Sequence, residues 1–252
     1  MSASVADSVA LVTGGNRGIG EAFVRELLAG GARKIYCGAR DPGQVPADLV
    51  AAGVVPIGLD ITDPRSAAGA AASCPDVTVL VNNAGHHGRD LLVRCRDEGT
   101  AREEMEVNYF GTLTMIRAFA DVLGRNGGGA IVNVLSVAGA IPTAFMGGYS
   151  PAKAATLFLS TIARAELEEQ GTSVTALIVG SVDTRMADHV EGEKEDPRDI
   201  ARTGLSAMAR GERTVDTDRM AWQARSRYVL DPARWERSMA KVMRSGRLET
   251  RR

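Results

Sequence analysis

The stretch Val9-Ala10-Leu11-Val12-Thr13-Gly14-Gly15-Asn16-Arg17-Gly18-Ile19-Gly20 decides the fold of this 252-residue chain. A short apolar run is followed by a glycine-rich turn, and Phe23, Leu27 and Leu28 then recur at helical spacing. The glycines allow a tight turn, and the N–H groups and positive dipole at the start of the helix suit a pyrophosphate. Many strand-to-helix turns are merely turns, but this order of strand, turn and helix favours a dinucleotide site.

Strands and helices alternate along the rest of the chain. Apolar runs predict further strands over 34–39, 53–60, 77–81, 130–135 and 173–179. Asp63 is a natural N-cap for the Ala-rich helix after the third strand. This alternation predicts an α/β fold, a single-domain Rossmann-type doubly wound parallel sheet over residues 1–252. Ligands are expected at the carboxyl ends of its strands.

Two long helices are expected in the second half of this pattern. One runs from Glu103 to Leu123 and carries Asn108, and the other runs from Tyr149 to about Gln170. The apolar face predicted for the second helix consists of Ala154, Leu157, Phe158, Ile162 and Ala165.

The bulk composition excludes several classes of partner. Acidic and basic residues nearly balance, 31 against 30, so no nucleic-acid or membrane partner is expected. No apolar run approaches the length of a membrane span, and the N-terminus shows no export signal. Cys37, Cys74 and Cys95 lack metal-ligand spacing and fit reduced thiols. We therefore expect a soluble, cytoplasmic protein.

Tyr149 and Lys153 lie four residues apart in the second long helix, on one face and one turn apart. Pro151 is compatible with a helix only in its first turn, which places Tyr149 at the mouth of the helix. A neighbouring ammonium favours phenolate, so the pKa of Tyr149 is expected to fall toward neutrality. Such a tyrosine is a proton donor for a developing alkoxide.

The second predicted strand ends at Arg40, about twenty residues after the last loop glycine. An acidic residue at this strand end holds the ribose hydroxyls of NAD, whereas an arginine suits the 2′-phosphate of NADP. Asp41 follows at once and argues for NAD, and a strand-end arginine is often only solvated. The pattern favours NADP(H) over NAD(H).

Five features, taken together, resemble the short-chain dehydrogenase/reductase family over residues 8 to 185. They are the glycine loop, Asn82-Asn83-Ala84-Gly85, Asn108, Ser136, and Tyr149 with Lys153, in that order and spacing. The resemblance implies NAD(P)-dependent oxidation of alcohols or reduction of carbonyls by a homodimer or homotetramer. Its small-molecule substrate would be a ketone, an aldehyde or a secondary alcohol.

The resemblance also implies residue roles. Tyr149 would be the catalytic acid, Lys153 would hold the cofactor ribose and lower the tyrosine pKa, and Ser136 would bind the substrate oxygen. Asn108 would hold a helix kink and a water of the proton relay. The cofactor would contact Gly14, Asn16, Arg17, Gly18, Ile19, Gly20, Arg40, Asp60, Ile61, Asn83, Ala84, Tyr149, Lys153, Gly180, Val182 and Thr184.

One position departs from the family pattern. The family has Pro-Gly after the sixth strand where this chain has Val179-Gly180, which would make the nicotinamide-side turn less rigid. The segment after it, about 185–199, is polar and aperiodic and is expected to be a lid over the substrate, followed by a helical region over 200–244. The arginine-rich end from Arg244 to Arg252 is expected to be a solvated tail.

Residues outside these motifs are candidates for the substrate side. His86 and His87 could face the substrate, but with only His189 besides them a metal site is not expected. Thr143, Ala144, Phe145 and Met146 are expected to line the pocket. With Ile141 they suggest a moderately apolar ketone or secondary alcohol. Trp222 and Trp235 could cap the pocket, although packing between subunits is favoured.

Two other classes compete with a reductase. A non-catalytic NADP-binding regulator would use the same fold but would not need an intact set of Asn108, Ser136, Tyr149 and Lys153. A nucleotide-sugar epimerase or dehydratase shares the Tyr/Lys pair but needs a larger C-terminal region than the 68 residues after Thr184. The sequence therefore favours an NADP(H)-dependent carbonyl reductase.

Overall fold

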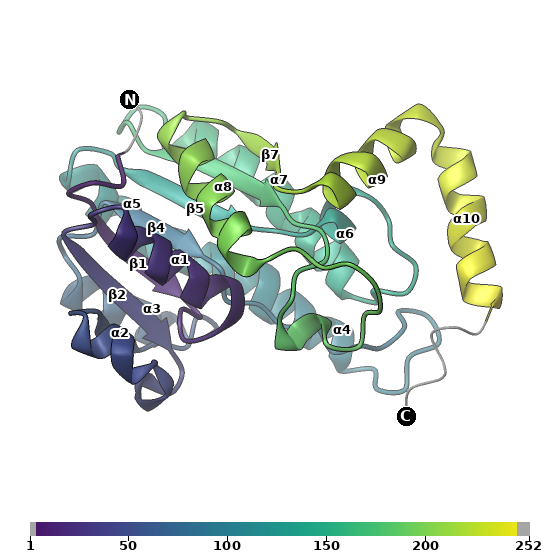
Figure 1. The fold of residues 1–252 in the computed structure, drawn as a ribbon, viewed down its shortest axis with the longest axis horizontal. Coiled ribbons are helices and arrows are strands. Elements are labelled where there is room, and N and C mark those ends of the chain that lie inside the picture. Colours follow the sequence, from purple (N-terminus) through teal and green to yellow (C-terminus); the bar gives the residue numbers. More distant parts are fainter. Residues whose placement is uncertain (1–3, 246–252) are drawn as a thin grey trace.

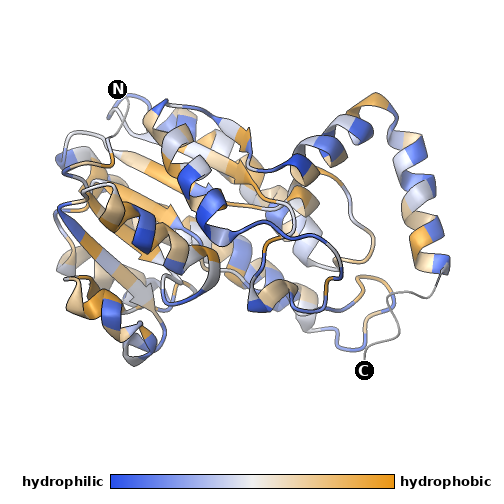
Figure 2. Ribbon diagram, in the orientation of Figure 1, coloured by the Kyte–Doolittle hydropathy of each residue, from blue (hydrophilic) through white to orange (hydrophobic). Residues whose placement is uncertain are grey.

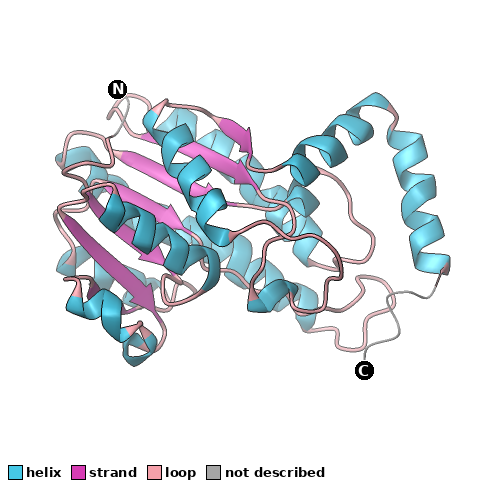
Figure 3. Ribbon diagram, in the orientation of Figure 1, coloured by secondary structure: helices cyan, strands magenta, loops and turns pink. Residues whose placement is uncertain are grey.

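A seven-stranded parallel sheet forms the centre of the molecule, in a computed structural model that describes residues 4–245 (Figure 1, Figure 3). The strand order is β3-β2-β1-β4-β5-β6-β7. The strands are β1 (Val9–Thr13), β2 (Lys34–Ala39), β3 (Val55–Gly58), β4 (Val79–Asn82), β5 (Ala130–Val134), β6 (Ser173–Ile178) and β7 (Thr214–Asp216). The predicted Rossmann-type sheet is confirmed. Its order reverses between β1 and β4, the position where such sheets bind ligands.

Helices cover both faces of the sheet. One face carries α1 (Gly18–Ala29), α2 (Ala47–Ala51) and α8 (Pro197–Ala209). The other carries α3 (Pro64–Ser73), α5 (Thr112–Arg125) and α7 (Tyr149–Glu166). Figure 2 shows the strands as the apolar layer between them, as expected for a parallel sheet buried on both faces.

The remaining helical elements lie around the carboxyl ends of the strands and at the C-terminus. They are η1 (Pro42–Gln44), α4 (Thr100–Met105), η2 (Glu106–Gly111), α6 (Val137–Ala140), η3 (Arg185–Ala187), α9 (Arg219–Leu230) and α10 (Pro232–Arg244). Helices α9 and α10 form an arm beside the body of the molecule (Figure 1). The indole N–H of Trp235 in α10 donates to the Pro142 carbonyl at 2.8 Å, whereas Trp222 is 60% exposed. Most of the predicted tail lies outside the described residues.

The two long helices differ from their predictions. The first begins at Thr100 and is interrupted by η2, a π-helical turn around Asn108, before α5 continues. Helix α7 ends at Glu166, and its predicted apolar face does not face the core, because Phe158 is 73% and Ile162 is 53% exposed. The buried side of α7 is instead partly polar, since Ser160 accepts a hydrogen bond from Asn133 of β5 at 2.9 Å.

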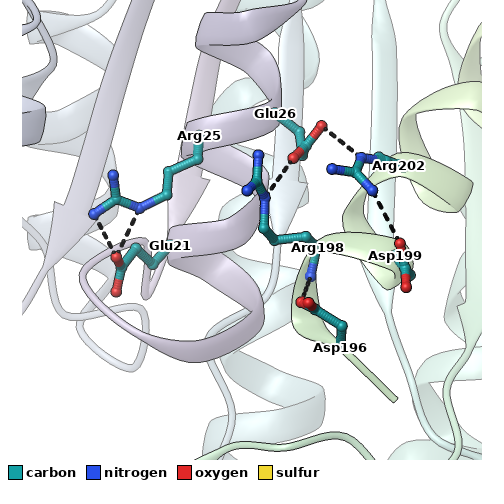
Figure 4. Close-up of polar contacts among 7 residues, drawn as sticks. All are labelled: Glu21, Arg25, Glu26, Asp196, Arg198, Asp199 and Arg202. Atoms are coloured by element: carbon teal, nitrogen blue, oxygen red, sulfur yellow. Dashed lines mark hydrogen bonds and ion pairs between the residues drawn. The ribbon is translucent and has the colours of Figure 1, made fainter.

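Helix α8 is fixed to α1 by charge and by close packing. The half-buried carboxylate of Glu26 accepts hydrogen bonds from Arg198 at 2.9 Å and Arg202 at 3.1 Å (Figure 4). A Cβ on Gly204 would lie 2.5 Å from Leu177 and 2.9 Å from Phe23, so glycine permits this contact. The expected lid precedes α8, so its downstream end is anchored to the body.

No helix among residues 4–245 combines the length and the apolar character that crossing a membrane requires.

The glycine loop gives the first testable prediction. A Cβ on Gly20 would lie 2.1 Å from the Gly14 carbonyl oxygen and 2.4 Å from Asn83 Nδ2. Gly20→Ala should therefore lower the free energy of unfolding by about 3 kcal/mol, because backbone must move. Gly69 is exposed in α3, and an added Cβ would meet nothing within 4 Å. Gly69→Ala should therefore raise the free energy of unfolding by about 0.5–1 kcal/mol. Urea unfolding measures both, and equal stability of the two variants would contradict the close-contact explanation.

Candidate active site

A cavity of about 1350 Å³ opens at the carboxyl ends of the strands. Its walls include most of the residues predicted to contact a cofactor. These are Gly14, Asn16, Arg17, Gly18, Arg40, Asp60, Ile61, Asn83, Ala84 and Thr184. Ile19, Gly20, Gly180 and Val182 are not among the lining residues, and neither are Tyr149 and Lys153, which are buried. The cavity is large enough for a dinucleotide with a small substrate beside it.

The glycine loop and the Asn82-Asn83-Ala84-Gly85 turn are joined by hydrogen bonds. Thr13 Oγ1 accepts from the backbone N–H groups of Asn83 and Ala84, each at 3.0 Å. The side-chain amide of Asn83 donates to the carbonyls of Thr13 and Gly14 at 3.0 and 3.2 Å. The side-chain N–H groups of Asn83 therefore hold the glycine loop, and only its Oδ1 is left for the predicted contact with the cofactor ribose.

Two glycines of this loop have backbone conformations that side chains disfavour. Gly14 has φ of +62° and Gly18 has φ of +57°. A Cβ on Gly18 would lie 3.3 Å from Thr184 Cγ2. The loop therefore lies directly against the segment that follows β6, which brings the predicted pyrophosphate and nicotinamide contacts together.

Three arginines gather at the cavity. The pKa of Arg17 is lowered by burial and then by the positive charges of Arg185 and Arg40. None of the three forms an ion pair with a carboxylate among residues 4–245. An unpaired cluster of this kind has the charge that an anionic ligand needs.

The two acids near these arginines are already engaged. Asp41, which could have argued for NAD, caps η1 by accepting from the Gly43 N–H and from the Gln44 side chain, each at 3.0 Å. Asp60 Oδ1 accepts from the N–H and hydroxyl of Thr62 at 2.9 and 2.7 Å. These bonds, with the charge of Arg40, lower the pKa of Asp60.

Asn108 links the π-helical turn to the loop after β4. Its side-chain amide donates to the carbonyls of His86 at 2.7 Å and Glu104 at 2.8 Å, and its Oδ1 accepts from the His86 N–H at 3.2 Å. Its backbone carbonyl accepts from Thr156 of α7 at 2.9 Å. Asn108 therefore lies at the helix irregularity expected for it and fixes three segments of the site.

Tyr149 is the first residue of α7, as the position of Pro151 predicts, and it is buried. Its phenol lies close enough to the Ser136 hydroxyl for this side chain to lower the Tyr149 pKa, and Ser136 caps α6 after the end of β5. Burial raises the pKa of Tyr149 to about 12. The phenol is therefore protonated at neutral pH, the state that a general acid needs.

Lys153 is 5% exposed, and its ammonium donates to the Val134 carbonyl at 3.0 Å. It lies 5.6 Å from the centre of the Tyr149 ring. The predicted lowering of the Tyr149 pKa is wrong for this structure, because burial outweighs the charge of a lysine directed at a backbone carbonyl. The pKa of Lys153 itself is lowered to about 8 by burial.

Close packing joins this buried group to the cavity. A Cβ on Gly139 of α6 would lie 2.6 Å from the Lys153 backbone, so glycine lets α6 press against α7. A Cβ on Gly85 would lie 2.9 Å from Asn108 Oδ1 and 3.5 Å from Lys153 Nζ. Gly85 also lines the cavity, so Asn108 and Lys153 lie immediately behind its wall.

The turn after β6 is braced by a residue that the sequence did not point to. The Gly180 N–H donates to Asp218 Oδ2 at 2.7 Å, and Asp218 also caps α9 through the Ala221 N–H at 2.8 Å. This carboxylate holds the turn where the family pattern has proline. Asp218 is 38 residues away in sequence, and only its value as a helix cap could have singled it out.

Arg89, which the sequence analysis also missed, ties the expected lid to the loop after β4. Its guanidinium donates to the Arg185 and Met186 carbonyls at 3.2 and 3.1 Å and to Asp188 Oδ1 at 2.7 Å. At the other end of the segment, Glu195 exchanges backbone hydrogen bonds with Ser181 and Asp183, each at 2.9 Å. The segment is fastened at both ends, and its role as a lid stays a prediction.

His87 lines the cavity and also contacts the ring of Tyr149. Its ring centroid lies 5.0 Å from that of Tyr149 and 6.2 Å from that of His189 in the expected lid. Nε2 of His86 instead lies 3.6 Å from Oε2 of Glu103. Among residues 4–245, no three His, Cys, Asp or Glu side chains form a group that could hold a metal ion.

The buried lysine gives a pH-dependent prediction. Unfolded Lys153 has a pKa near 10.5, so between pH 8 and 10.5 the unfolded chain binds a proton that the folded chain does not. The stability of the wild type relative to Lys153→Met should therefore rise with pH across this window, by up to about 3 kcal/mol. Denaturant unfolding of both proteins measures the difference. If the difference in unfolding free energy between the two proteins stays constant or falls as the pH rises, burial does not lower the pKa of Lys153.

A seven-stranded Rossmann sheet with a glycine loop at its switch point and a buried Ser, Tyr and Lys beside it defines a nicotinamide-dependent oxidoreductase. Comparison with protein families matches residues 8–195 to the short chain dehydrogenase family. The chain belongs to this family, whose members oxidise CH–OH groups or reduce C=O groups with NAD(P).

Relatives agree in sequence and in structure. A short chain dehydrogenase from Burkholderia cenocepacia, solved in complex with NADP, is 37% identical, with a TM-score of 0.89 over 94% of this chain and 98% of that one. A 3-oxoacyl-[acyl-carrier-protein] reductase of Vibrio cholerae is 31% identical over 77% of this chain and 86% of the relative. A 3-alpha-(or 20-beta)-hydroxysteroid dehydrogenase of Mycobacterium bovis is 34% identical over 83% and 80%.

Proposed function

We propose that this chain is an NADP(H)-dependent carbonyl reductase that converts a ketone or an aldehyde to the alcohol, with Tyr149 as the proton donor. The observation that carries the proposal is the buried, protonated Tyr149, which lies beside Ser136 and 5.0 Å from the ring of His87 in the cavity wall. These two hydroxyls can hold one carbonyl oxygen between them.

The chain's own residues account for the proton side of the reaction. Bound NADPH supplies the hydride. Ser136 donates a hydrogen bond to the substrate oxygen, and Tyr149 transfers its proton to that oxygen as negative charge develops. Lys153 stabilises the phenolate left behind once its ammonium turns from the Val134 carbonyl toward that oxygen. Asn108 fixes the loop after β4 against α7 through its hydrogen bonds with His86 and Thr156.

Three observations support NADP(H) over NAD(H). Arg17 and Arg40 border the cavity without a carboxylate partner among the described residues. Asp41 is turned into the cap of η1 rather than left free for ribose hydroxyls. The Burkholderia cenocepacia relative was solved with NADP. A 2′-phosphate would neutralise part of the arginine cluster.

The competing classes are not favoured. A regulator that only binds the cofactor has no need for Ser136 at Tyr149 or for a lysine buried at a cost in free energy. The relatives, a reductase and a dehydrogenase, do not support an epimerase or dehydratase of nucleotide-sugars.

A homodimer or homotetramer and a cytoplasmic location complete the proposal. Phe110 of η2 and Phe158 and Ile162 of α7 are 46%, 73% and 53% exposed, which supports contact between subunits through these helices. Cys37, Cys74 and Cys95 are free thiols, as is usual in a reducing compartment.

The test is NADPH consumption by the purified protein with ketones, aldehydes, quinones and keto-esters, with NADH run beside it. The proposal expects consumption of NADPH matched by formation of the alcohol, and much slower consumption of NADH. Tight NADPH binding without turnover of any carbonyl, or of any alcohol with NADP⁺, would favour the regulator.

A further inference from the structure

We propose that His87 and His189 form a hydrogen-bonding clamp for a second oxygen of the substrate. The enzyme would then take carbonyl compounds that carry a hydroxyl, ketone or ester oxygen close to the reacting carbonyl. This inference rests on the proposed function, because it assigns the substrate class of that same site.

The two imidazoles belong to different segments that meet beside the phenol. His87 follows β4 and lines the cavity, with its ring 5.0 Å from the Tyr149 ring. His189 lies in the 185–196 segment, with its ring 6.2 Å from that of His87. Arg89 holds this segment against the loop after β4 through Arg185, Met186 and Asp188. His87 therefore lies in the cavity wall and within ring-contact distance of both Tyr149 and His189.

Each imidazole has a buried nitrogen that nothing satisfies. His87 Nε2 and His189 Nδ1 are inaccessible to solvent and have no hydrogen-bond partner among residues 4–245. The carboxylate nearest His189 Nδ1 is that of Asp188 at 3.6 Å, beyond hydrogen-bond distance and already paired with Arg89 at 2.7 Å. Unsatisfied buried polar atoms are uncommon and costly, so two at one site indicate a ligand that supplies the partner.

The protonation state of His87 determines which kind of substrate oxygen the clamp can bind. Burial lowers the pKa of His87 to about 4, and the neighbouring His189, Arg89 and His86 add smaller contributions in the same direction. His87 is therefore neutral at physiological pH and does not attract a carboxylate. A neutral imidazole can accept from a hydroxyl or donate to a carbonyl.

The spacing limits where the second oxygen lies on the substrate. Because the His87 ring lies 5.0 Å from the Tyr149 ring, an oxygen bound by the imidazoles belongs to a group close to the carbonyl held at Tyr149. α-Hydroxyketones and β-keto esters have this arrangement. The plain apolar ketone suggested by Ile141, Phe145 and Met146 would leave both nitrogens unpaired.

The experiment compares substrate pairs. An α-hydroxyketone and a β-keto ester are each measured against the ketone of the same length without the second oxygen, using NADPH with wild type and His87→Leu. We expect wild type to favour the oxygenated member in kcat/KM, and His87→Leu to reduce that preference about 10- to 100-fold, mainly through KM. Intrinsic differences in carbonyl reactivity cancel when the two proteins are compared. The Kd for NADPH should not change.

Further variants separate the clamp from general damage. His189→Leu tests the second imidazole from a different segment and should reduce the same preference. His87→Gln keeps a hydrogen-bonding side chain and should restore part of it. His86→Leu is the matched control, because His86 faces Glu103, and it should keep the preference of the wild type.

Two results would overturn the inference, and they differ. Turnover of plain and oxygenated ketones with the same preference in wild type, His87→Leu and His189→Leu would remove the clamp and leave the reductase intact. Absence of NADPH-dependent turnover for every carbonyl tested would remove the proposed function and the clamp with it.

Discussion

Tyr149→Phe should lower kcat by at least about 10²- to 10⁴-fold, the contribution of a general acid. The variant keeps the buried ring and loses only the hydroxyl that Ser136 contacts. Since the proton is needed only when the substrate oxygen becomes negative, the loss should appear in kcat, and the Kd for NADPH should stay nearly constant. Steady-state kinetics and a binding titration measure the two quantities.

A matched control removes a tyrosine hydroxyl elsewhere. Tyr36 of β2 donates to Asp76 at 2.8 Å, away from the cavity, so Tyr36→Phe should keep full turnover while losing some stability. Retention of wild-type kcat in Tyr149→Phe would exclude it as the acid. Loss of NADPH binding together with activity would indicate a structural role instead.

Arg40→Ala should weaken NADPH binding about 10- to 150-fold and leave NADH binding nearly unchanged. The range corresponds to the loss of a hydrogen bond to a charged group, about 1.5–3 kcal/mol. Arg40 follows β2, lines the cavity and has no carboxylate partner among the described residues, so it is free to meet a 2′-phosphate. The Kd values for the two cofactors measure the change.

The control for this prediction lies at the other end of the same strand. Arg33 immediately precedes β2, is exposed and does not line the cavity, so Arg33→Ala should leave both Kd values unchanged. Equal weakening of NADPH and NADH by Arg40→Ala would refute a phosphate contact. An additional loss in the double variant with Arg17→Ala would support a shared site.

The sequence was sufficient for six of the seven strands because their signals are local, whereas β7 lies within the segment 200–244 that was expected to be helical. Buried strands are short apolar runs, and the glycines of the 13–20 loop indicate its turn, because Gly14 and Gly18 have positive φ. Pro151 fixed the start of α7 at Tyr149 for the same reason, since proline is accepted only in a first helical turn. Ser136 then followed from its place at the end of β5.

What sequence reasoning missed depends on contacts between distant segments. The buried side of α7 could not be predicted from apolar spacing, because Ser160 is buried through Asn133 while Phe158 is exposed. The pKa of Tyr149 depends on how deeply the phenol is buried and on where the Lys153 ammonium points. Asp218 and Arg89 act 38 and 96 or more residues away from their partners, and no local motif marks either.

The central claim is that hydride passes between NADP(H) and a carbonyl carbon beside Tyr149, and transfer of a label tests it most directly. The protein is given NADPH carrying deuterium at both C4 positions and a keto substrate that it turns over, and the alcohol is examined by mass spectrometry and NMR. The account predicts one deuterium on the carbinol carbon for each NADPH consumed, and almost no product with Tyr149→Phe. Alcohol without deuterium on that carbon, or an equal yield from Tyr149→Phe, would contradict it.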